Sequence, residues 1–435
     1  MKFFVSLLKR SFENKLLAGS FIMMVGSLIT GFGNYLYHLL MGRMLGPVDY
    51  GVLASLISLV YLLSIPVGTL NLVIVKFVST LKGQKRLGEV GVLFQVVNQR
   101  VLIISLLGFL VYLGFSPLLA SFLHLNSVLP LVIVGIFSLI AVMTMINRAV
   151  LQGLLWFGYL SASNILEVVL KLGLAVLLVI WGYQVYGALF AFIVGGAVSY
   201  VFSLFPLKSL LAVSGEKKTF DGRQMVTFAV PVFLSTIAFT SLYTADIILV
   251  RHFLPAQQAG FYSALATLGK IIYFVSLPVI LVLFPMVAER HANGRHYKPL
   301  LLASSGLVGL VCLTITGVYF LFPGLMVSIL FGRDYLPAAP YLGLFGIYLS
   351  LYCFSFLLVN FYLSINKSRA VLLPVAAALL QIVLIAFFHQ NLGQVIWISI
   401  VVTALLLISL LIYNFLREIV EASKAPKYNF DRIKK

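Results

Sequence analysis

Seven ionisable side chains lie within or beside long apolar stretches, where a charge is costly and usually serves a purpose. A charged group at the centre of a lipid bilayer costs about 2.5–3.5 kcal/mol on insertion scales, so such groups are functional candidates. Cationic side chains suit phosphate oxygens through charge-assisted hydrogen bonds. A buried carboxylate suits a proton or another cation. The seven residues are Arg43, Lys76, Glu167, Lys171, Asp246, Arg251 and Lys270.

Four of these charges lie inside the apolar stretches themselves. Glu167 and Lys171 have the i, i+4 spacing of a helical ion pair, in the favourable order. They form either a self-neutralising pair facing the bundle interior or a cavity pair that opens to engage a substrate or a proton. Asp246 and Lys270 lie on successive stretches, so they either tie two helices together or line a translocation cavity.

Motifs for catalysis are missing from the sequence. There is no GxxxxGK[ST] loop for ATP, no Ser/His/Asp arrangement, and no spacing that suits a metal. The two cysteines, Cys312 and Cys353, each lie in an apolar run and are expected to pack as small hydrophobic residues. We therefore expect neither an enzyme nor a bound cofactor or metal.

The amino-acid composition indicates which kind of structure holds these charged residues in place. Of the 435 residues 62% are hydrophobic and 10% are charged, and the mean hydropathy is +1.10. These values exclude an ordinary soluble domain and predict an all-α polytopic membrane protein, since runs of about 20 apolar residues cross a bilayer. The first run is too long for a signal peptide and is expected to be retained. Twelve membrane helices are predicted, at 17–41, 51–75, 91–115, 128–148, 158–181, 184–206, 226–250, 260–287, 300–321, 338–363, 370–388 and 393–416.

The basic residues alternate between the predicted loops. One set of loops and tails holds 25 of the 30 lysines and arginines, and the other holds only Arg43, Arg251 and Arg333. By the positive-inside rule this predicts that both termini are cytoplasmic and supports the count of twelve helices. The net charge of +18 is thus explained by topology, and nucleic acid is not an expected partner.

The two halves of the chain share features that indicate a duplication. Arg43, Pro47 and Gly51 follow the first predicted helix, as Arg251, Pro255 and Gly260 follow the seventh. "SPLLASFLHL" and "FPGLMVSILFG" then follow the third and ninth helices as outer loops with a proline before a short apolar run. We predict two lobes with one orientation, related by an axis along the membrane normal. The predicted regions are an N-terminal lobe 1–207, a cytoplasmic linker 208–224, a C-terminal lobe 225–416 and a basic tail 417–435 attracted to anionic lipids.

Three stretches resemble one family in particular. "GRMLGPVDYGVLASL" from Gly42, "NRAVLQGLLWFGYLSASNILEVVLKLGLAVLL" from Asn147 and "TADIILVRHFLPAQQAGFYSALATLGK" from Thr244 are similar to polysaccharide transporters of the multidrug/oligosaccharidyl-lipid/polysaccharide exporter superfamily. The resemblance implies two six-helix lobes around a V-shaped central cavity that opens to each side in turn. It places Arg43, Lys76, Asp246, Arg251 and Lys270 on or near the substrate path, with Asp246, Glu167 and Lys171 as candidates for ion coupling.

The resemblance also implies a function. Its members move lipid-diphosphate-linked oligosaccharides across the cytoplasmic (inner) membrane for cell-surface polysaccharide synthesis, so membrane lipids and such a substrate are the expected partners, with glycosyltransferase or polymerase machinery as further candidates. Two alternatives stay open. One is a cation-coupled multidrug antiporter of the same superfamily, although Leu16 to Met41 lacks the acid that such proteins carry in their first helix. The other is a non-transporting scaffold of a polysaccharide assembly complex.

Overall fold

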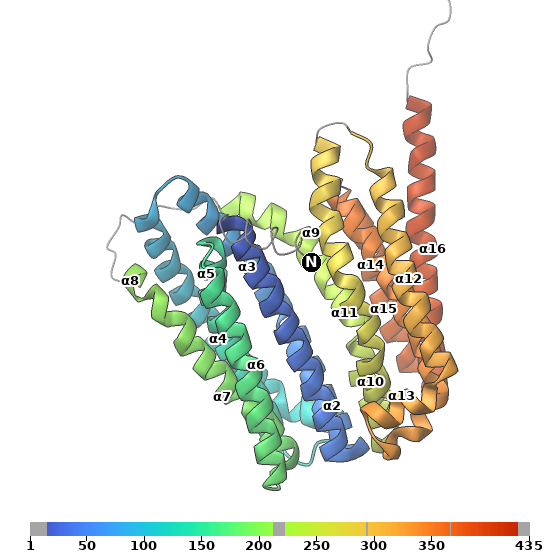
Figure 1. Ribbon diagram of the computed structural model, residues 1–435. Coiled ribbons are helices and arrows are strands. Elements are labelled where there is room, and N and C mark those ends of the chain that lie inside the picture. Colours follow the sequence, from blue (N-terminus) through green and yellow to red (C-terminus); the bar gives the residue numbers. More distant parts are fainter. Residues whose placement is uncertain (1–14, 212–221, 293–294, 366, 425–435) are drawn as a thin grey trace, which may run out of the picture.

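The computed structural model describes residues 15–211, 222–292, 295–365 and 367–424. These residues contain twelve helical stretches long and apolar enough to cross a membrane, so the predicted number of spans is confirmed. The predicted linker 208–224 and basic tail 417–435 lie partly outside the described residues, and the loop charges on residues 1–14 lie wholly outside them. The described part of the chain is almost entirely helical (Figure 1).

The first lobe contains the helices α2 to α8. They are α2 (Lys15–Leu63), α3 (Ile65–Gly83), α4 (Leu87–Phe122), α5 (Leu129–Gly153), α6 (Phe157–Ile180), α7 (Gln184–Leu204), the short 3-10 helix η1 (Phe205–Leu207) and α8 (Lys208–Leu211). Within this lobe α6 packs against both α2 and α7, and α5 packs against α3, α4 and α7. The lobe thus has its own helix–helix core.

The second lobe contains the helices α9 to α16. They are α9 (Gly222–Leu242), α10 (Ala245–Phe253), α11 (Ala256–Ala292), α12 (Lys298–Leu321), α13 (Pro323–Leu330), η2 (Arg333–Tyr341), α14 (Leu342–Ser364), η3 (Ser368–Val371), α15 (Leu372–Phe387) and α16 (Leu392–Lys424). The helix α14 packs against α11, α12 and α16 and forms the centre of this lobe.

The two lobes meet at one end and splay apart toward the other, where α9 of the second lobe crosses to pack against α3 of the first (Figure 1). At the end where they meet, α2 packs against α10, α11 and η2 of the second lobe. We call this the closed end; it carries Arg43, Arg251 and Arg333, the three basic residues that the sequence places apart from the others. Which end faces the cytoplasm stays a prediction.

The predicted turn between the first two spans is tighter than expected. The chain is helical from Lys15 to Leu63 except at Gly46, whose φ of 73° and ψ of 176° break the helix. A glycine adopts this positive φ without the clash that a Cβ would cause, and Pro47 can begin the next helix because its φ is already fixed near the helical value. The sequence pattern drew attention to Pro47 and Gly51, but Gly46 is the residue at which the helix breaks.

Gly51 has a different role, which is to let the lobes touch. A Cβ at Gly51 would lie 2.9 Å from the backbone nitrogen of Gly260, and a Cβ at Gly260 would lie 1.9 Å from the carbonyl oxygen of Pro47. The glycines that mark the two copies of the turn therefore pack against each other across the lobe interface.

Three spans are longer or more broken than the sequence predicts. The third span was expected to end at 115, but α4 continues through Pro117 to Phe122. In an apolar segment, continued helix satisfies more backbone groups than a loop would, and the Ser116 hydroxyl donates a 2.7 Å hydrogen bond to the Leu113 carbonyl. The second span is instead interrupted at Ser64, between α2 and α3, and the seventh is interrupted between α9 and α10.

Candidate functional site

The most distinctive charge lies at the junction of the two lobes. The Lys270 ammonium group, on α11, is 5.3 Å from the ring centre of Tyr61 and 5.0 Å from that of Tyr243. Tyr61 belongs to the first lobe and Tyr243 to the second. Aromatic faces attract a cation through the ring quadrupole. Among the residues that the structure describes, no carboxylate lies within ion-pair distance of Lys270, and Asp246 acts on its charge only from farther away.

Both aromatic neighbours of Lys270 lie next to helix breaks. Tyr61 is three residues before Ser64, where the second span is interrupted, and the Ser64 hydroxyl donates to the Tyr61 carbonyl over 2.7 Å. Tyr243 lies in the break between α9 and α10. Transporters commonly build substrate and ion sites at discontinuous membrane helices, because the ends of half-helices expose polar backbone groups. Lys270 thus lies beside an interruption in one span of each lobe.

A polar chain connects the lobes between Lys270 and the closed end. The Nδ1 atom of His38 is 3.2 Å from the Tyr50 hydroxyl, which is 2.8 Å from the Thr267 hydroxyl on α11. Tyr50 is fully buried and Thr267 is 6% exposed. Because this link joins α2 to α11 one turn before Lys270, it fixes the position of Lys270 relative to the first lobe.

Lys171 has a similar environment inside the first lobe. Its ammonium group donates a hydrogen bond to the Asn34 side-chain oxygen. It also lies 5.2 Å from the ring centre of Tyr37 and 4.6 Å from that of Phe192. These contacts join α6 to α2 and α7, so Lys171, like Lys270, lies between aromatic rings of two different helices.

The expected pair between Glu167 and Lys171 does not form. The Glu167 carboxylate is instead 2.7 Å from the Arg148 guanidinium group on α5. Arg148 also donates to Ser163 on α6 and to the Ser199 hydroxyl on α7, at 3.0 and 2.6 Å. Spacing along one helix predicted the wrong partner because a cation on a neighbouring helix reaches the same carboxylate. Glu167 is thus part of a link that holds three helices of the first lobe together.

Asp246 is buried within the second lobe. It is 1% exposed and accepts a 2.7 Å hydrogen bond from the Tyr262 hydroxyl and a 2.8 Å bond from the backbone N–H of Ile247. It lies in the first turn of α10, where the helix dipole favours a negative charge. In the described part of the chain it makes no direct ion pair with Lys270; the two charges interact from farther apart, and the direct bond from Asp246 to α11 is the one to Tyr262.

The remaining predicted site residues lie away from Lys270. The guanidinium groups of Arg43 and Arg251 are both at the closed end, where each donates hydrogen bonds to backbone carbonyls of the opposite lobe. Lys76 is exposed on α3. The structure therefore does not gather the five predicted residues into one cluster.

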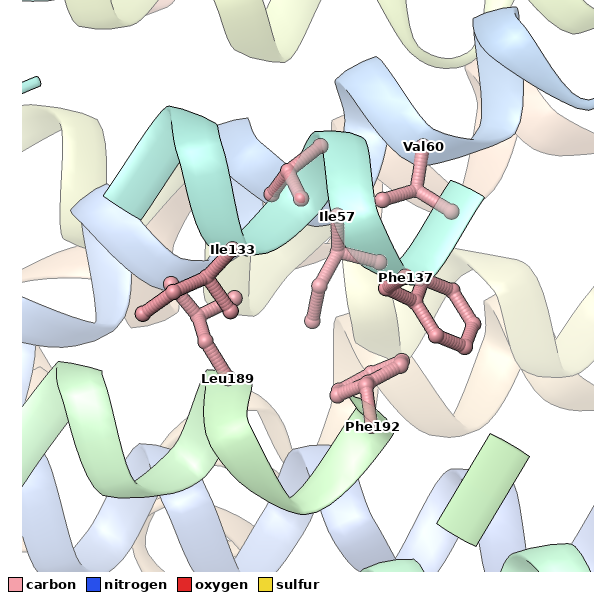
Figure 2. A pocket seen from close by; sticks show the side chains of 7 residues that line it. Ile57, Val60, Ile133, Phe137, Leu189 and Phe192 are labelled. Carbon is pink, nitrogen blue, oxygen red and sulfur yellow. The ribbon is translucent and has the colours of Figure 1, made fainter. Parts of the chain in front are cut away.

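A small pocket in the first lobe offers no site for a polar ligand. Figure 2 shows its lining, which comes from α2, α5 and α7 and is wholly apolar. The lining residues are Ile57, Val60, Ile133, Val134, Phe137, Leu189 and Phe192. Sugars and phosphates would find no hydrogen-bond partner there, so the pocket is a packing defect of the lobe core.

Comparison with known proteins identifies the family. A family model described as "Polysaccharide biosynthesis protein" matches residues 40–340. This range includes both copies of the turn and every predicted site residue. The chain belongs to this family of polysaccharide biosynthesis proteins. A search of curated proteins finds no match.

Solved structures show that the fold is that of known membrane transporters. A multidrug resistance transporter of the MATE family, of the MOP superfamily, solved in an inward-facing conformation, matches with a TM-score of 0.70 at 14% identity, covering 90% of this chain and 96% of that one. The MATE multidrug transporter DinF-BH matches at 0.67 and 16%, covering 92% and 95%. The lipid II flippase MurJ, in an inward closed conformation, matches at 0.65 and 14%, covering 91% and 87%. The predicted fold class is confirmed.

The sequence did not identify Asn34, Tyr61 and Tyr243 as partners of the two lysines. The chain contains 21 tyrosines, so a tyrosine in an apolar run carries little information by itself. A usable signal was the position of Tyr61 just before Ser64 and Pro66, because a proline in a predicted span marks a helix break.

Proposed function

We propose that this chain is a flippase that moves a lipid-diphosphate-linked oligosaccharide across the cytoplasmic membrane by alternating access, for the assembly of cell-surface polysaccharide. The observation that carries the proposal is Lys270, a membrane-embedded cation that makes no direct ion pair among the described residues and lies between the broken helices of both lobes. A diphosphate supplies the negative charge that this ammonium group lacks, and the tyrosine rings beside it suit stacking against sugar rings.

The family supports a role in polysaccharide synthesis, and the fold supports transport by alternating access. The family description names polysaccharide biosynthesis, and one of the proteins that share the fold is a lipid II flippase. The distribution of basic residues favours cytoplasmic termini. In that orientation the closed end faces outward, and the lobes diverge toward the cytoplasm, where a lipid-linked precursor is made.

The test is a flipping assay in proteoliposomes. A fluorescent oligosaccharide on a short polyprenyl diphosphate is placed in both leaflets, and the fraction quenched from outside is followed with time. Lys270→Gln should reduce the flipping rate at least tenfold, because the anionic head loses its counter-charge in the membrane. Lys208→Gln is the matched control, since Lys208 also lies over an aromatic ring, that of Phe205, but on the surface of the first lobe. Equal rates for Lys270→Gln and the wild type would refute the assignment.

A second candidate is a cation-coupled drug antiporter. It is favoured by the likeness to two multidrug transporters and by the buried carboxylate of Asp246. This candidate requires that the protein expel cationic dyes and that Asp246→Asn abolish the expulsion. Flipping of the lipid diphosphate without dye transport would exclude it, and a scaffold without transport would show neither activity.

A further inference from the structure

A guanidinium group of the second lobe binds the first lobe at the closed end. The Arg251 Nε atom donates to the Leu123 carbonyl over 3.1 Å, and an Nη atom donates to the His124 carbonyl over 3.4 Å. These carbonyls directly follow the last residue of α4. The last carbonyls of a helix have no partner within it and carry the negative end of the helix dipole, which favours a cation.

The same arrangement occurs in the opposite direction. Arg43, of the first lobe, donates from one Nη atom to the carbonyls of Ser328 and Ile329. These residues lie in the last turn of α13, in the second lobe. Arg43 and Arg251 occupy equivalent places in the two copies of the turn, and α13 and the end of α4 are the two copies of the proline-containing segment. The two contacts are therefore related by the internal repeat.

A second hydrogen bond between the lobes lies beside each arginine. The Tyr335 hydroxyl donates to the carbonyl of Gly42 over 2.9 Å. The Nδ1 atom of His252 lies 2.7 Å from the carbonyl of Phe122, and its ring stacks on the Phe122 ring at 3.9 Å. Each arginine thus lies in a small patch of polar contacts between the lobes.

We propose that Arg43 and Arg251 form a two-part latch that holds the lobes together at the closed end and is released when that end opens. The proposal rests on the alternating access of the proposed function, which requires the lobes to separate here. Both arginines donate their hydrogen bonds to carbonyls in or just after the last turn of a helix, and Asp49 of the first lobe attracts Arg251 without a direct ion pair. When the lobes part, water can replace the guanidinium groups on these carbonyls, so the latch opens without leaving an unpaired buried acid.

The two halves of the latch are unequal. Arg251 is 7% exposed and uses two different nitrogen atoms for its two carbonyls, whereas Arg43 is exposed and uses one. Hydrogen bonds from a charged donor are worth more when water is excluded. We therefore expect Arg251 to contribute more to holding the closed end together.

The latch can be tested by measuring the distance between the lobes, without any substrate. Spin labels are attached at Asn126→Cys and Gln390→Cys, two exposed positions in closed-end loops of opposite lobes, in a Cys312→Ala, Cys353→Ala background in lipid nanodiscs. Double electron–electron resonance then gives the ratio of separated to closed molecules. Because no substrate is present, failure of the latch is distinguishable from failure of the flippase assignment.

The variants are Arg43→Gln, Arg251→Gln and the double substitution. We expect the ratio of separated to closed molecules to rise at least tenfold in the double variant, and to rise more for Arg251→Gln than for Arg43→Gln. Arg333→Gln is the matched control, since it removes an exposed arginine from the same end and should leave the ratio unchanged. A double variant with the wild-type distance distribution would overturn the proposal.

Lysine variants provide a second test in case the glutamine variants do not fold. Arg43→Lys with Arg251→Lys keeps both charges but cannot reproduce the fork of guanidinium donors. We expect an intermediate rise in the separated fraction. If the lysine pair folds and its distances match those of the wild type, a latch made by these guanidinium groups is excluded.

Discussion

The carboxylate of Glu167 lies 2.7 Å from the guanidinium group of Arg148, on the neighbouring helix, and not against Lys171 one turn away on its own helix. Both side chains are 19% exposed, so water competes only partly for the pair. The pair therefore links α5 and α6 inside the first lobe, and it leaves Lys171 with Asn34 and two aromatic rings as its neighbours.

The first prediction concerns this pair. Arg148→Gln should lower the free energy of unfolding by about 1–3 kcal/mol, because the carboxylate and the Ser199 hydroxyl lose a charged donor. The measurement is unfolding in mixed micelles. The double variant Arg148→Gln, Glu167→Gln should be less destabilised than the sum of the two single variants, because each residue loses the same partner. Strict additivity would show that the pair contributes no coupling energy.

The second prediction concerns the contact between the two glycines. Gly260→Ala should open the closed end or destabilise the fold, because its Cβ would meet the Pro47 carbonyl oxygen at 1.9 Å. A backbone atom cannot move aside as a flexible side chain can. Gly306→Ala is the control, since a Cβ there meets nothing within 4 Å. The spin-label distance between the lobes and the thermal midpoint should both change for Gly260→Ala and neither for Gly306→Ala.

The third prediction concerns the aromatic neighbours of Lys270. Tyr243→Leu should weaken the apparent affinity for the lipid diphosphate about 3- to 30-fold, the range expected when a cation loses an aromatic partner that holds it. Tyr243→Phe keeps the ring and should bind nearly as the wild type does. The maximal flipping rate should change less than the affinity. If the two variants behave alike, the ring of Tyr243 does not position the ammonium group.

The fourth prediction concerns ion coupling. Asp246 is the one buried carboxylate among the side chains that the structure describes, so it is our first candidate to carry the coupling cation. Asp246→Asn should make flipping insensitive to an imposed proton or sodium gradient. Tyr262→Phe, which removes the 2.7 Å hydrogen bond to Asp246 but keeps the carboxyl group, should retain a response to the gradient. A gradient response that survives in Asp246→Asn would assign coupling elsewhere.

The sequence predicted the architecture well because the bilayer constrains it strongly. The thickness of the bilayer sets the length of an apolar span, and basic residues gather in alternate loops. Both patterns can be recognised in the sequence alone. The duplication stays a prediction from the sequence, and the structure adds that Arg43 and Arg251, at matching places, both bond to the opposite lobe. The resemblance of three stretches to polysaccharide transporters agrees with the family model that matches residues 40–340.

The site was less predictable because its contacts run between helices. Glu167 and Lys171 share a helix face, but nothing in the order of residues shows that Arg148 lies closer. Lys270 was recognised as a candidate, yet Tyr61 is 209 positions from it and is brought near only by the packing of α2 on α11. The single-residue break at Gly46 was likewise hidden by the more conspicuous Pro47 and Gly51.

The contact between Gly51 and Gly260 also bears on how the chain has been able to evolve. If the two halves arose by duplication, most positions were free to diverge independently afterwards. Here the two copies of one position touch, so a substitution in either half acts on the other. Relatives with a larger residue at one of these positions should carry a compensating change at the other turn. In an alignment of such relatives, positions 51 and 260 would then vary together, even where the other similarities between the two halves have been lost.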